Sequence, residues 1–435
     1  MRVPKFIVEG GRPLNGTIRP AGNKNAALPM LAATLLTEEE VVIENVPAIK
    51  DVKTLLELLR MLGAEAEWTG ENEVRVRARN VGGVDLDAAA AARIRASILL
   101  AGPMLARAGG MRLPPPGGDV IGRRRMDTHF LALQRLGADF EYDRDTFAIT
   151  ARPGGLQGAD IFLDEPSVTA TENTVMAASL AKGTTRLRNA ASEPHVQDLC
   201  RMLVGMGCEI DGIGSNTLEI HGVERLRGGR FRVSADHIEV GSFIGLAAVT
   251  RGEITIQDAA PHFLDSTLLG FSRLGIQVEI RGEDAFIPGN QEMRIQMDLG
   301  GYTPKIDDGP WPAFPADLTS IALVTATQCK GTILIHEKMF ESRMFFADRL
   351  VAMGAQLILC DPHRVVVIGP SQLRGGVVES PDIRAGMGLL IAALGAQGQS
   401  EIYNISQIER GYERIDERLR ALGANIERSD SREDR

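Results

Sequence analysis

Apolar and polar positions along the chain follow one long unit that repeats six times. The string (Leu or Met)-Gly-x-x-apolar occurs with its glycine at Gly63, Gly137, Gly207, Gly275, Gly354 and Gly423. Successive spacings are 74, 70, 68, 79 and 69 residues. Each copy closes a stretch with helical periodicity, such as 52–61 or 198–206, and leads into a short strand pattern. Glycine just past a helix end supplies the left-handed backbone of a C-cap, so the string predicts six helix ends.

An earlier and more uniformly apolar helix belongs to each copy. Examples are 173–181 before a strand pattern at 184–187, and 240–249 before one at 254–257. The unit therefore reads β-α-β-α-β-β, which predicts an α/β fold. Solenoid repeats run to about 20–50 residues, so units of this length indicate small layered subdomains instead. Six of them group as two similar lobes of three.

Two irregular stretches interrupt this pattern. Residues 222–230 are charged and rich in turn formers, which makes them a candidate boundary between the lobes. Residues 300–315 are rich in Pro, Gly and Asp and predict a surface or cleft loop in the second half. The polar tail 429–435 is expected to fray.

Composition narrows the class of protein. A net charge of −9 argues against a general nucleic-acid binder, which needs a basic field. Four cysteines without a C-x-x-C pair favour neither a disulfide framework nor a structural zinc site, and they fit a reducing compartment. The first residues lack a signal-peptide core, and the apolar stretches 96–106 and 386–396 are too short to span a bilayer. We therefore expect a soluble cytoplasmic protein with no membrane partner.

Two glycine-containing clusters in the first half suggest anion binding. In 21–29, a turn with Asn23, Lys24 and Asn25 runs into an apolar helix, and a helix start with a lysine is a natural anion site. The simpler interpretation is that Asn23 caps the helix and Lys24 is solvated. In 113–124, glycines lie beside arginines, which suits a lid over a phosphate or a plain surface connection.

Two further clusters lie in the second half. Asp317 follows a proline-rich turn and is either a general base or a helix N-cap. Arg343, Arg384 and Arg410 each have a neighbouring acid, so each taken alone is as well explained by a surface ion pair.

Taken together and in this order, the clusters resemble the UDP-N-acetylglucosamine enolpyruvyl transferase family. The resemblance runs from Gly10 to Arg428 and is most specific at 24–29, 95–98, 167–173 and 410–415. It implies a two-lobed inside-out α/β barrel of six repeats, with the active site in the cleft between the lobes. The implied lobes are residues 22–232, and residues 1–21 joined to 233–428.

The resemblance also implies roles for individual residues. Those implied to bind phosphoenolpyruvate are Lys24, Asn25, Arg124, Arg343 and Arg410. Those implied to bind the UDP-sugar are Asn25, Arg95, Arg124, Thr128, Ser167, Val168, Thr169, Asp317 and Met339. Further polar positions of the cleft are Glu341, Asp382 and Arg384.

The implied reaction joins two small-molecule substrates, phosphoenolpyruvate and UDP-N-acetylglucosamine, and requires neither a metal nor an organic cofactor. Asp119 is the candidate proton donor, Asp317 the candidate base, and Lys24 a third catalytic candidate. A monomer is compatible with these expectations.

Several positions depart from the family pattern. Asp119 stands where many members have the cysteine that the antibiotic fosfomycin alkylates, which predicts insensitivity to that reagent. Thr169 stands where glycine is usual, 125–129 replaces an Arg-Pro-x-Asp-x-His run, and His195 replaces a second glutamate.

Two alternatives remain open at this point. The sister reaction on shikimate 3-phosphate shares the fold, but Lys24 is not followed by the Ser-x-Ser-x-Arg run expected there. The other alternative is a divergent paralogue that binds a UDP-sugar without turnover. The residues Asp119 and Thr169 favour this alternative.

Overall fold

A computed structural model of the chain describes residues 4–82, 86–118, 121, 124–143 and 146–429. The chain divides into two compact units. Unit 1 comprises residues 1–21, 120–123 and 235–435, and unit 2 comprises residues 22–119 and 124–234. The last change from unit 2 to unit 1, after Ser234, lies two residues beyond the lobe boundary expected at 232.

The third repeat shows the complete unit on which the others are built. Its elements are β9 (Asp160–Phe162), α6 (Val168–Ala178), β10 (Thr184–Arg188), α7 (Pro194–Gly205), β11 (Glu209–Asp211) and β12 (Thr217–His221). The strand order is β11-β12-β10-β9, with β9 parallel to β10 and the other neighbours antiparallel. This is the β-α-β-α-β-β unit that the sequence predicts.

Two further sheets complete unit 2. The first repeat contains α1 (Lys24–Ala33), η1 (Thr34–Leu36), β3 (Glu40–Glu44), α2 (Lys50–Met61), β4 (Glu65–Gly70) and β5 (Glu73–Arg77). Its parallel strand is β13 (Gly229–Arg232), from the far end of the unit. The second repeat contains α3 (Ala88–Ala91), η2 (Arg95–Leu100), α4 (Ala101–Ala108), β6 (Gly110–Leu113), α5 (Asp127–Arg135), β7 (Ala138–Asp143) and β8 (Thr146–Ala151). Its described strands follow the order β6-β8-β7.

Unit 1 repeats the same plan. The fourth repeat contains β2 (Gly16–Ile18), α8 (His237–Thr250), β14 (Ile254–Ile256), η3 (Pro261–Phe263), α9 (Asp265–Arg273), β15 (Glu279–Arg281) and β16 (Asp284–Ile287). The fifth contains β17 (Lys305–Asp307), η4 (Ala316–Leu318), α10 (Thr319–Ala326), β18 (Gly331–His336), η5 (Arg343–Phe346), α11 (Ala347–Ala352), β19 (Leu357–Asp361) and β20 (Arg364–Gly369). The sixth contains β21 (Val377–Glu379), α12 (Ile383–Gly395), β22 (Gln399–Tyr403), η6 (Ile408–Arg410), α13 (Ile415–Ala421) and β23 (Asn425–Ser429).

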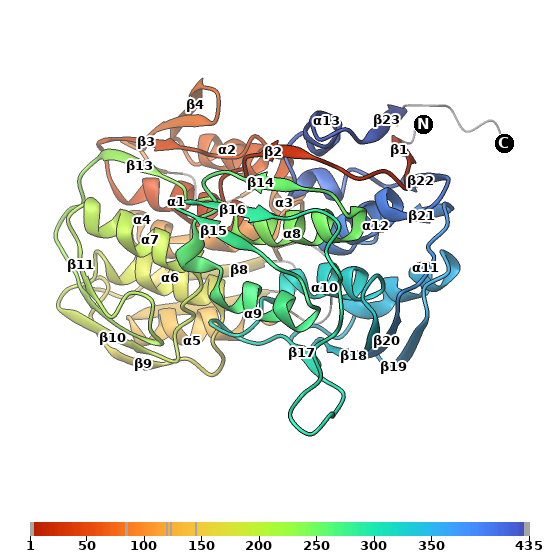
Figure 1. Ribbon diagram of the computed structural model, residues 1–435. Coiled ribbons are helices and arrows are strands. Elements are labelled where there is room, and N and C mark those ends of the chain that lie inside the picture. The colour runs from red at the N-terminus through yellow and green to blue at the C-terminus, as the bar shows by residue number, and fades with distance from the viewer. Residues whose placement is uncertain (1–3, 83–85, 119–120, 122–123, 144–145, 430–435) are drawn as a thin grey trace. The chain divides into compact units, whose positions relative to one another are not determined.

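The N-terminal strand β1 (Lys5–Glu9) completes the sixth sheet, whose order is β21-β22-β1-β23. Phe6 pairs with both Ile402 and Arg428, so the two ends of the sequence meet in one sheet (Figure 1). In each complete sheet the last strand lies between the second and third strands of its repeat. The sixth repeat therefore takes its last strand from the start of the chain.

The most apolar helix of each repeat lies inside its unit. In unit 1, α8, α10 and α12 are buried over nearly their whole length and contact one another. A helix that is hydrophobic on every side belongs in a core, whereas α2 carries a polar face on which Lys50, Lys53 and Arg60 are exposed. Helices inside and sheets outside are the inside-out α/β arrangement that the resemblance implies.

The six predicted helix ends are confirmed. Each repeat glycine follows the last turn of α2, α5, α7, α9, α11 or α13 and has a positive φ, between 79° and 106°. Only glycine enters this region without a steric penalty, so the string marks a backbone requirement.

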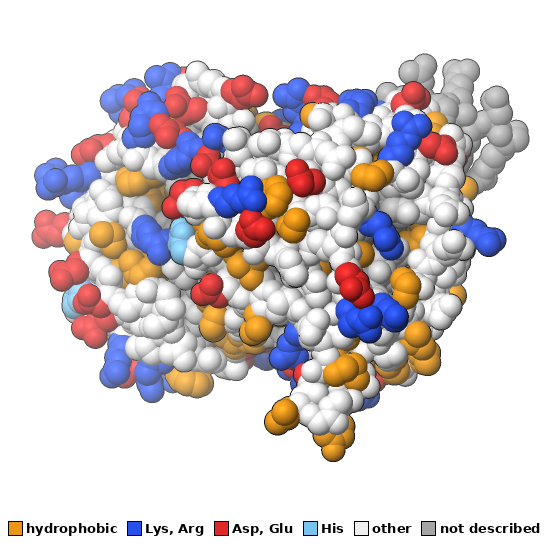
Figure 2. All heavy atoms as spheres, in the orientation of Figure 1, with side chains coloured by type: hydrophobic (Ala, Val, Ile, Leu, Met, Phe, Trp, Pro, Cys, Tyr) orange, Lys and Arg blue, Asp and Glu red, His pale blue; other side chains and the backbone are white. Residues whose placement is uncertain are grey.

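The predicted loop at 300–315 carries the short strand β17 and turns on Gly300 and Gly301. The exposed hairpin just before β17 forms the projection at the foot of Figures 1 and 2. Its residue Leu299 is 97% exposed. Among the described residues, no helix has both the length and the hydropathy needed to cross a bilayer.

Candidate active site

Residues predicted for the site recur at one structural position, the start of a buried helix. In unit 2 these are Lys24 and Asn25 on α1, Arg95 on η2, and Ser167 to Thr169 on α6. In unit 1 they are Asp317 on η4, which leads into α10, and Asp382 and Arg384 on α12. Free backbone N–H groups and the helix dipole make such starts favourable for anions.

Asp317 lies between two buried arginines. Its Oδ1 accepts from Arg343 Nη1 at 3.0 Å and its Oδ2 accepts from Arg384 Nε at 3.0 Å. Arg343 is 4% exposed and Arg384 5% exposed, whereas the Asp317 side chain is 26% exposed. The Asp317 carboxylate is thus the more solvent-accessible group of this cluster, and the two arginines are buried.

The charges of this cluster fix its protonation. Burial acts to raise the pKa of Asp317, but Arg384 and Arg343 outweigh it and hold the pKa well below its usual range. Asp317 is therefore ionised at neutral pH. Burial acts to lower the pKa of Arg384, but Asp317 outweighs it, so the guanidinium pKa is raised and the charge is retained.

Glu337 is a neighbour of Arg343 that was not predicted from the sequence as a site residue. It is fully buried, and its Oε1 accepts from the backbone N–H groups of Met339 at 3.2 Å and Phe340 at 3.1 Å. Its Oε2 lies 3.8 Å from Arg343 Nε. Burial first, and then the neighbouring Asp308 carboxyl, raise the pKa of Glu337 to about 9. No feature of the sequence distinguishes Glu337 from a glutamate on the protein surface.

Glu337→Gln should change how stability depends on pH. A carboxyl whose pKa is higher in the folded state than in the unfolded state stabilises at low pH, and this stabilisation is lost as pH rises towards the folded pKa, here about 9. Glutamine keeps the acceptor oxygen and cannot ionise. Between about pH 6 and pH 9 the melting temperature of the variant should therefore fall less than that of the native protein. Thermal melts across this range measure the difference. Glu341→Gln, at an exposed position, is the control. Parallel melting curves for all three proteins would contradict an un-ionised Glu337.

The other predicted residues of unit 1 have distinct surroundings. Asp382 is the N-cap of α12, and its Oδ1 accepts from the N–H groups of Arg384 at 2.8 Å and Ala385 at 2.9 Å. Met339 is 40% exposed and Glu341 is exposed. Arg410, on η6, donates to Gln407 Oε1 at 3.0 Å.

At the start of α1, Asn23 caps the helix, because its Oδ1 accepts from Asn25 N at 2.8 Å. The simpler interpretation of this cluster therefore holds for Asn23, but its second part, a solvated Lys24, is wrong. Lys24 is 8% exposed and its Nζ lies 2.7 Å from Asp51 Oδ2, at the start of α2. Burial without a partner is costly for an ammonium group, so Asp51 is what lets Lys24 lie inward.

The start of η2 brings Arg95 to the loop before α5. Its Nη2 donates to the carbonyls of Arg124 at 2.8 Å and Arg125 at 3.0 Å. Burial, followed by the charge of Arg124, lowers the pKa of Arg95 to about 10, which still leaves it charged. Thr128 is buried and donates to Asp164 at 2.7 Å.

The start of α6 carries the remaining residues predicted in unit 2. Ser167 is the N-cap and accepts from Ala170 N at 3.4 Å. Val168 and Thr169 form the first turn.

Asp236 and His237, at the start of α8, were missed. Asp236 is the N-cap and accepts from Ile238 N at 2.9 Å and Glu239 N at 3.2 Å. Burial, followed by the charge of Arg384, lowers the pKa of His237 to about 4, so the ring is neutral. The repeat register could have found them, because Asn23, Ser167 and Asp382 occupy the same N-cap position in other copies.

Asp119 and Arg123 lie outside the described residues. Within the described part, one group of side chains could share a metal ion: Glu209, Asp211 and His221, on the β11–β12 hairpin. Two of these three are exposed, and nothing further indicates a metal there.

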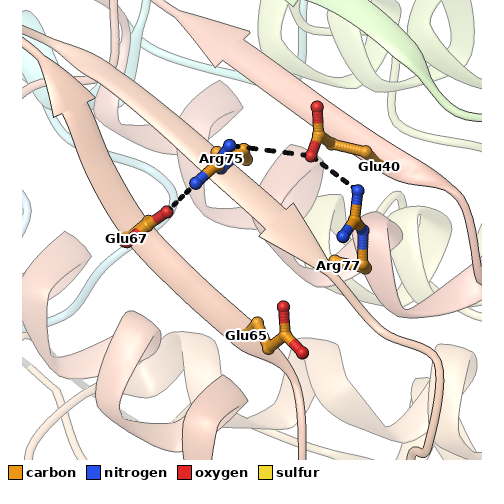
Figure 3. A pocket seen from close by; sticks show the side chains of 5 residues that line it. All are labelled: Glu40, Glu65, Glu67, Arg75 and Arg77. Carbon is orange, nitrogen blue, oxygen red and sulfur yellow. Dashed lines mark hydrogen bonds and ion pairs between the residues drawn. The ribbon is translucent and has the colours of Figure 1, made fainter.

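A surface hollow over β3, β5 and β4 is lined by Glu40, Glu65, Glu67, Arg75 and Arg77 (Figure 3). Ion pairs join Arg75 to Glu67 and Arg77 to Glu40 there, the latter at 2.9 Å. These arginines are already matched by acids, so this ladder stabilises the sheet surface and does not form the candidate site.

Comparison with known proteins decides the family. Residues 8–419 match the family EPSP synthase (3-phosphoshikimate 1-carboxyvinyltransferase). The UDP-N-acetylglucosamine 1-carboxyvinyltransferase of Bradyrhizobium diazoefficiens is 60% identical over 424 residues, covering 98% of each chain. The protein of that name from Treponema denticola is 55% identical, covering 97% of this chain and 99% of its own.

The chain belongs to the UDP-N-acetylglucosamine 1-carboxyvinyltransferase family.

Solved structures agree with this family on the fold. The enolpyruvyl transferase NikO from Streptomyces tendae superposes with a TM-score of 0.87 at 25% identity, over 99% of both chains. EPSP synthase from Acinetobacter baumannii superposes with a TM-score of 0.75 at 18% identity, over 98% of this chain and 100% of its own. Membership of this transferase family makes the chain an enzyme, and the shared fold confirms the inside-out α/β architecture.

Proposed function

We propose that the chain transfers the enolpyruvyl group of phosphoenolpyruvate to the 3-hydroxyl of UDP-N-acetylglucosamine and releases phosphate. The observation that carries this is Asp317, an ionised carboxylate held between buried Arg343 and Arg384, in a chain 60% identical to a full-length relative of that name. Such a product is the first committed intermediate of peptidoglycan synthesis. The setting would be the cytoplasm of a dividing cell that builds a wall.

The proposed chemistry begins with protonation of the methylene carbon of phosphoenolpyruvate, which leaves a cationic carbon bearing the phosphate oxygen. The sugar hydroxyl attacks this carbon while Asp317 accepts its proton. The adduct then loses a methyl proton and phosphate, which restores the double bond and breaks the carbon–oxygen bond to phosphate. Atoms and charges balance with the two substrates alone, so no redox partner or group carrier enters.

Cationic side chains would neutralise the substrates. We propose Lys24, Arg124, Arg343 and Arg410 for the carboxylate and phosphate of phosphoenolpyruvate. Buried Arg343 and Arg384 flank the partly exposed Asp317, and these two guanidinium groups support an anionic ligand on unit 1. Charge-assisted bonds of this kind are roughly twice as strong as neutral ones.

We propose that the UDP-sugar contacts a set of polar and apolar positions: Asn25, Arg95, Arg124, Thr128, Ser167, Val168, Thr169, Asp317 and Met339. Buried Thr128 already donates its hydroxyl to Asp164, so we propose that its backbone, and not its side chain, takes part. Asp382 would act by capping α12 and so placing Arg384, and Glu341 stays a proposed position near the substrates.

Acceptor preference tests the proposal against both alternatives. Phosphate release from phosphoenolpyruvate should depend on UDP-N-acetylglucosamine and should not be supported by shikimate 3-phosphate. Release with shikimate 3-phosphate alone would assign the sister reaction. Binding of UDP-N-acetylglucosamine without release would assign a non-catalytic paralogue.

Asp119→Asn should lower kcat by about 100-fold, because a positioned general acid contributes about 10²–10⁴-fold. Asp119→Cys should restore turnover and make the enzyme sensitive to fosfomycin, whereas the native enzyme should resist it. Steady-state kinetics with and without the epoxide measure both effects. Asp143→Asn, on the exposed end of β7, is the control.

Full turnover in Asp119→Asn would remove the proton-donor assignment. Inactivation of the native enzyme by fosfomycin would contradict the predicted resistance to this epoxide. Cys200, Cys208 and Cys329 are buried, and burial raises the pKa of each thiol, so exposed Cys360 is the thiol expected to react first with other reagents.

A further inference from the structure

Two buried carboxyl groups lie side by side in the fifth repeat, next to Arg343. The parallel strands β17 and β18 pair Asp307 with His336, and Asp308 and Glu337 are the residues that follow at the ends of the two strands. Asp308 N donates to His336 O at 3.3 Å, which carries the pairing one residue further. Asp308 is 1% exposed and Glu337 is 0% exposed. The sheet register therefore brings two acidic side chains together inside unit 1, where water does not reach them.

Backbone N–H groups bind one oxygen of each carboxyl. Asp308 Oδ1 accepts from the N–H of Lys338, and Glu337 Oε1 accepts from the next two N–H groups along the chain, at 3.2 and 3.1 Å. Three consecutive N–H groups of the segment 338–340 thus converge on the two side chains. The acidic pair therefore fixes the backbone between β18 and η5, the element that carries Arg343.

The second oxygen of each carboxyl lacks a donor. Within the described residues, no N–H or O–H group forms a hydrogen bond to Asp308 Oδ2 or Glu337 Oε2. Arg343 Nε lies 3.8 Å from Glu337 Oε2, beyond hydrogen-bonding distance. Thr319 is a further neighbour of Glu337, but its single hydroxyl proton goes to Ala316 O at 2.9 Å. Buried oxygens are rarely left unpaired, so the missing donor is a proton held by one of the two carboxyls.

Electrostatics lead to the same assignment. Two carboxylates that share a buried site repel each other, so one of them keeps its proton. The Asp308 side chain is in hydrogen-bonding contact with Glu337, and burial first, then this contact, raise the pKa of Glu337 to about 9. At neutral pH the pair thus holds one proton and one negative charge.

Charged and titratable groups surround the pair on each neighbouring element. They are Arg343 on η5, Asp317 on η4, Asp307 on β17, His336 and Lys338 around the end of β18, and His363 between β19 and β20. Lys338 forms its ion pair with Asp307, and His363 Nδ1 lies 2.8 Å from the backbone carbonyl of Glu337. Arg343 is therefore the cation on which a change in the charge of the pair would act most directly.

We propose that Asp308 and Glu337 share a single proton, that this acid pair positions Arg343, and that tight binding of phosphoenolpyruvate is confined to the pH range in which the proton is kept. Both are positioning residues, because they act through Arg343 and the segment 338–340. Loss of the proton places two negative charges side by side, and the added charge opposes an anionic ligand on Arg343. The inference rests on the proposed function for the identity of this ligand.

Steady-state kinetics of the full-length enzyme between about pH 7 and about pH 10 test the positioning role. The KM of the native enzyme for phosphoenolpyruvate should rise about tenfold as the pH passes through about 9, since one charge is added a few ångströms from Arg343. Glu337→Gln offers Asp308 an N–H in place of the acid proton and cannot ionise, so its KM should vary by less than about threefold. Asp307→Asn, one residue away on the same strand, is the control and should follow the native curve.

An equal rise in KM in Glu337→Gln and in the native enzyme would overturn the proposal. Asp308→Asn replaces Glu337→Gln if the latter fails to fold, because it too can never carry two negative charges. Its KM should likewise lack the alkaline rise, and a native-like rise in this variant would overturn the proposal.

Infrared spectra of the folded protein test the shared proton without turnover. At about pH 7 the native protein should show one more protonated-carboxyl C=O band than Glu337→Gln, and this band should disappear as the pH is raised past about 9. Asp308→Asn should move the loss of the band to lower pH, because it removes a carboxyl that raises the pKa of Glu337. Identical spectra for native protein and Glu337→Gln would overturn the shared proton.

The two measurements separate this inference from the proposed function. The predicted band together with a pH-independent KM would overturn the positioning role and leave the proposed function intact. Absence of acceptor-dependent phosphate release by the native enzyme at every pH would overturn the proposed function and the role in substrate binding. The infrared spectra would still decide whether the two carboxyls share a proton.

Discussion

Asp317→Asn is expected to lower kcat roughly 10³-fold, within the range of about 10²–10⁴-fold that a positioned general base contributes. Asparagine keeps the size of the side chain and the acceptor facing one arginine, but it cannot take up the proton of the sugar hydroxyl. The arginines make Asp317 a weak base by holding its pKa low. A weak base suffices here, because the hydroxyl becomes strongly acidic as its oxygen bonds to the cationic carbon.

The chain offers a matched control at Asp307. Its carboxylate is also paired with two cations, Lys305 at 3.0 Å and Lys338, and its side chain is 25% exposed, close to the 26% of Asp317. Asp307→Asn should keep kcat within about twofold, since surface ion pairs contribute about 0–1 kcal/mol. Steady-state phosphate release by the two variants, each checked by thermal melting, measures the contrast. More than half the native kcat in Asp317→Asn would remove the base assignment.

Arg343→Met is expected to reduce kcat/KM for phosphoenolpyruvate by about 10³-fold. Truncating one member of a buried hydrogen-bonded charge pair costs about 2–5 kcal/mol, and about 1.4 kcal/mol corresponds to tenfold. Arg343 also donates to Ala316 O at 3.2 Å, and its guanidinium lies 4.8 Å from the centre of the Phe340 ring. The loss therefore combines a missing substrate contact with a displaced Asp317.

Arg343→Lys and Arg364→Met separate these causes. Lysine keeps the charge but not the planar fork, so it should recover part of the activity. Arg364 is exposed and pairs with Asp361 across a turn, so its replacement should leave kcat/KM unchanged. Native-like kinetics in Arg343→Met would show that this arginine does not meet phosphoenolpyruvate.

Much of the fold follows from the sequence because the repeat string encodes a backbone requirement. The six glycines predict helix ends through their positive φ, and the apolar helices predict the interior. The resemblance implies that residues 1–21 join the second lobe, but the partner strands of β1 could not be predicted, since its pairing with β22 and β23 joins residues about as far apart in sequence as the chain allows. A strand pattern specifies alternation and not the partner.

The residues alone indicated the candidate site at the helix starts near Asn23 and Asp317, whereas Arg95, Ser167 and Asp382 followed from the family resemblance. Asn23, Arg95, Ser167, Asp317 and Asp382 all occupy such starts, and comparison of the repeats would have added Asp236. The partners Asp51 and Glu337 were not predictable. Their roles depend on distances to Lys24 and Arg343 that only the folded chain sets.

The fate of the oxygen that joins carbon to phosphorus in phosphoenolpyruvate tests enolpyruvyl transfer most directly. With oxygen-18 at this bridging position and UDP-N-acetylglucosamine present, the released phosphate should carry the label, because addition and elimination break the carbon–oxygen bond. Mass spectrometry should find the enolpyruvyl ether of the nucleotide sugar in equal amount. Label retained in pyruvate, or label released at the same rate without the acceptor, would contradict the account.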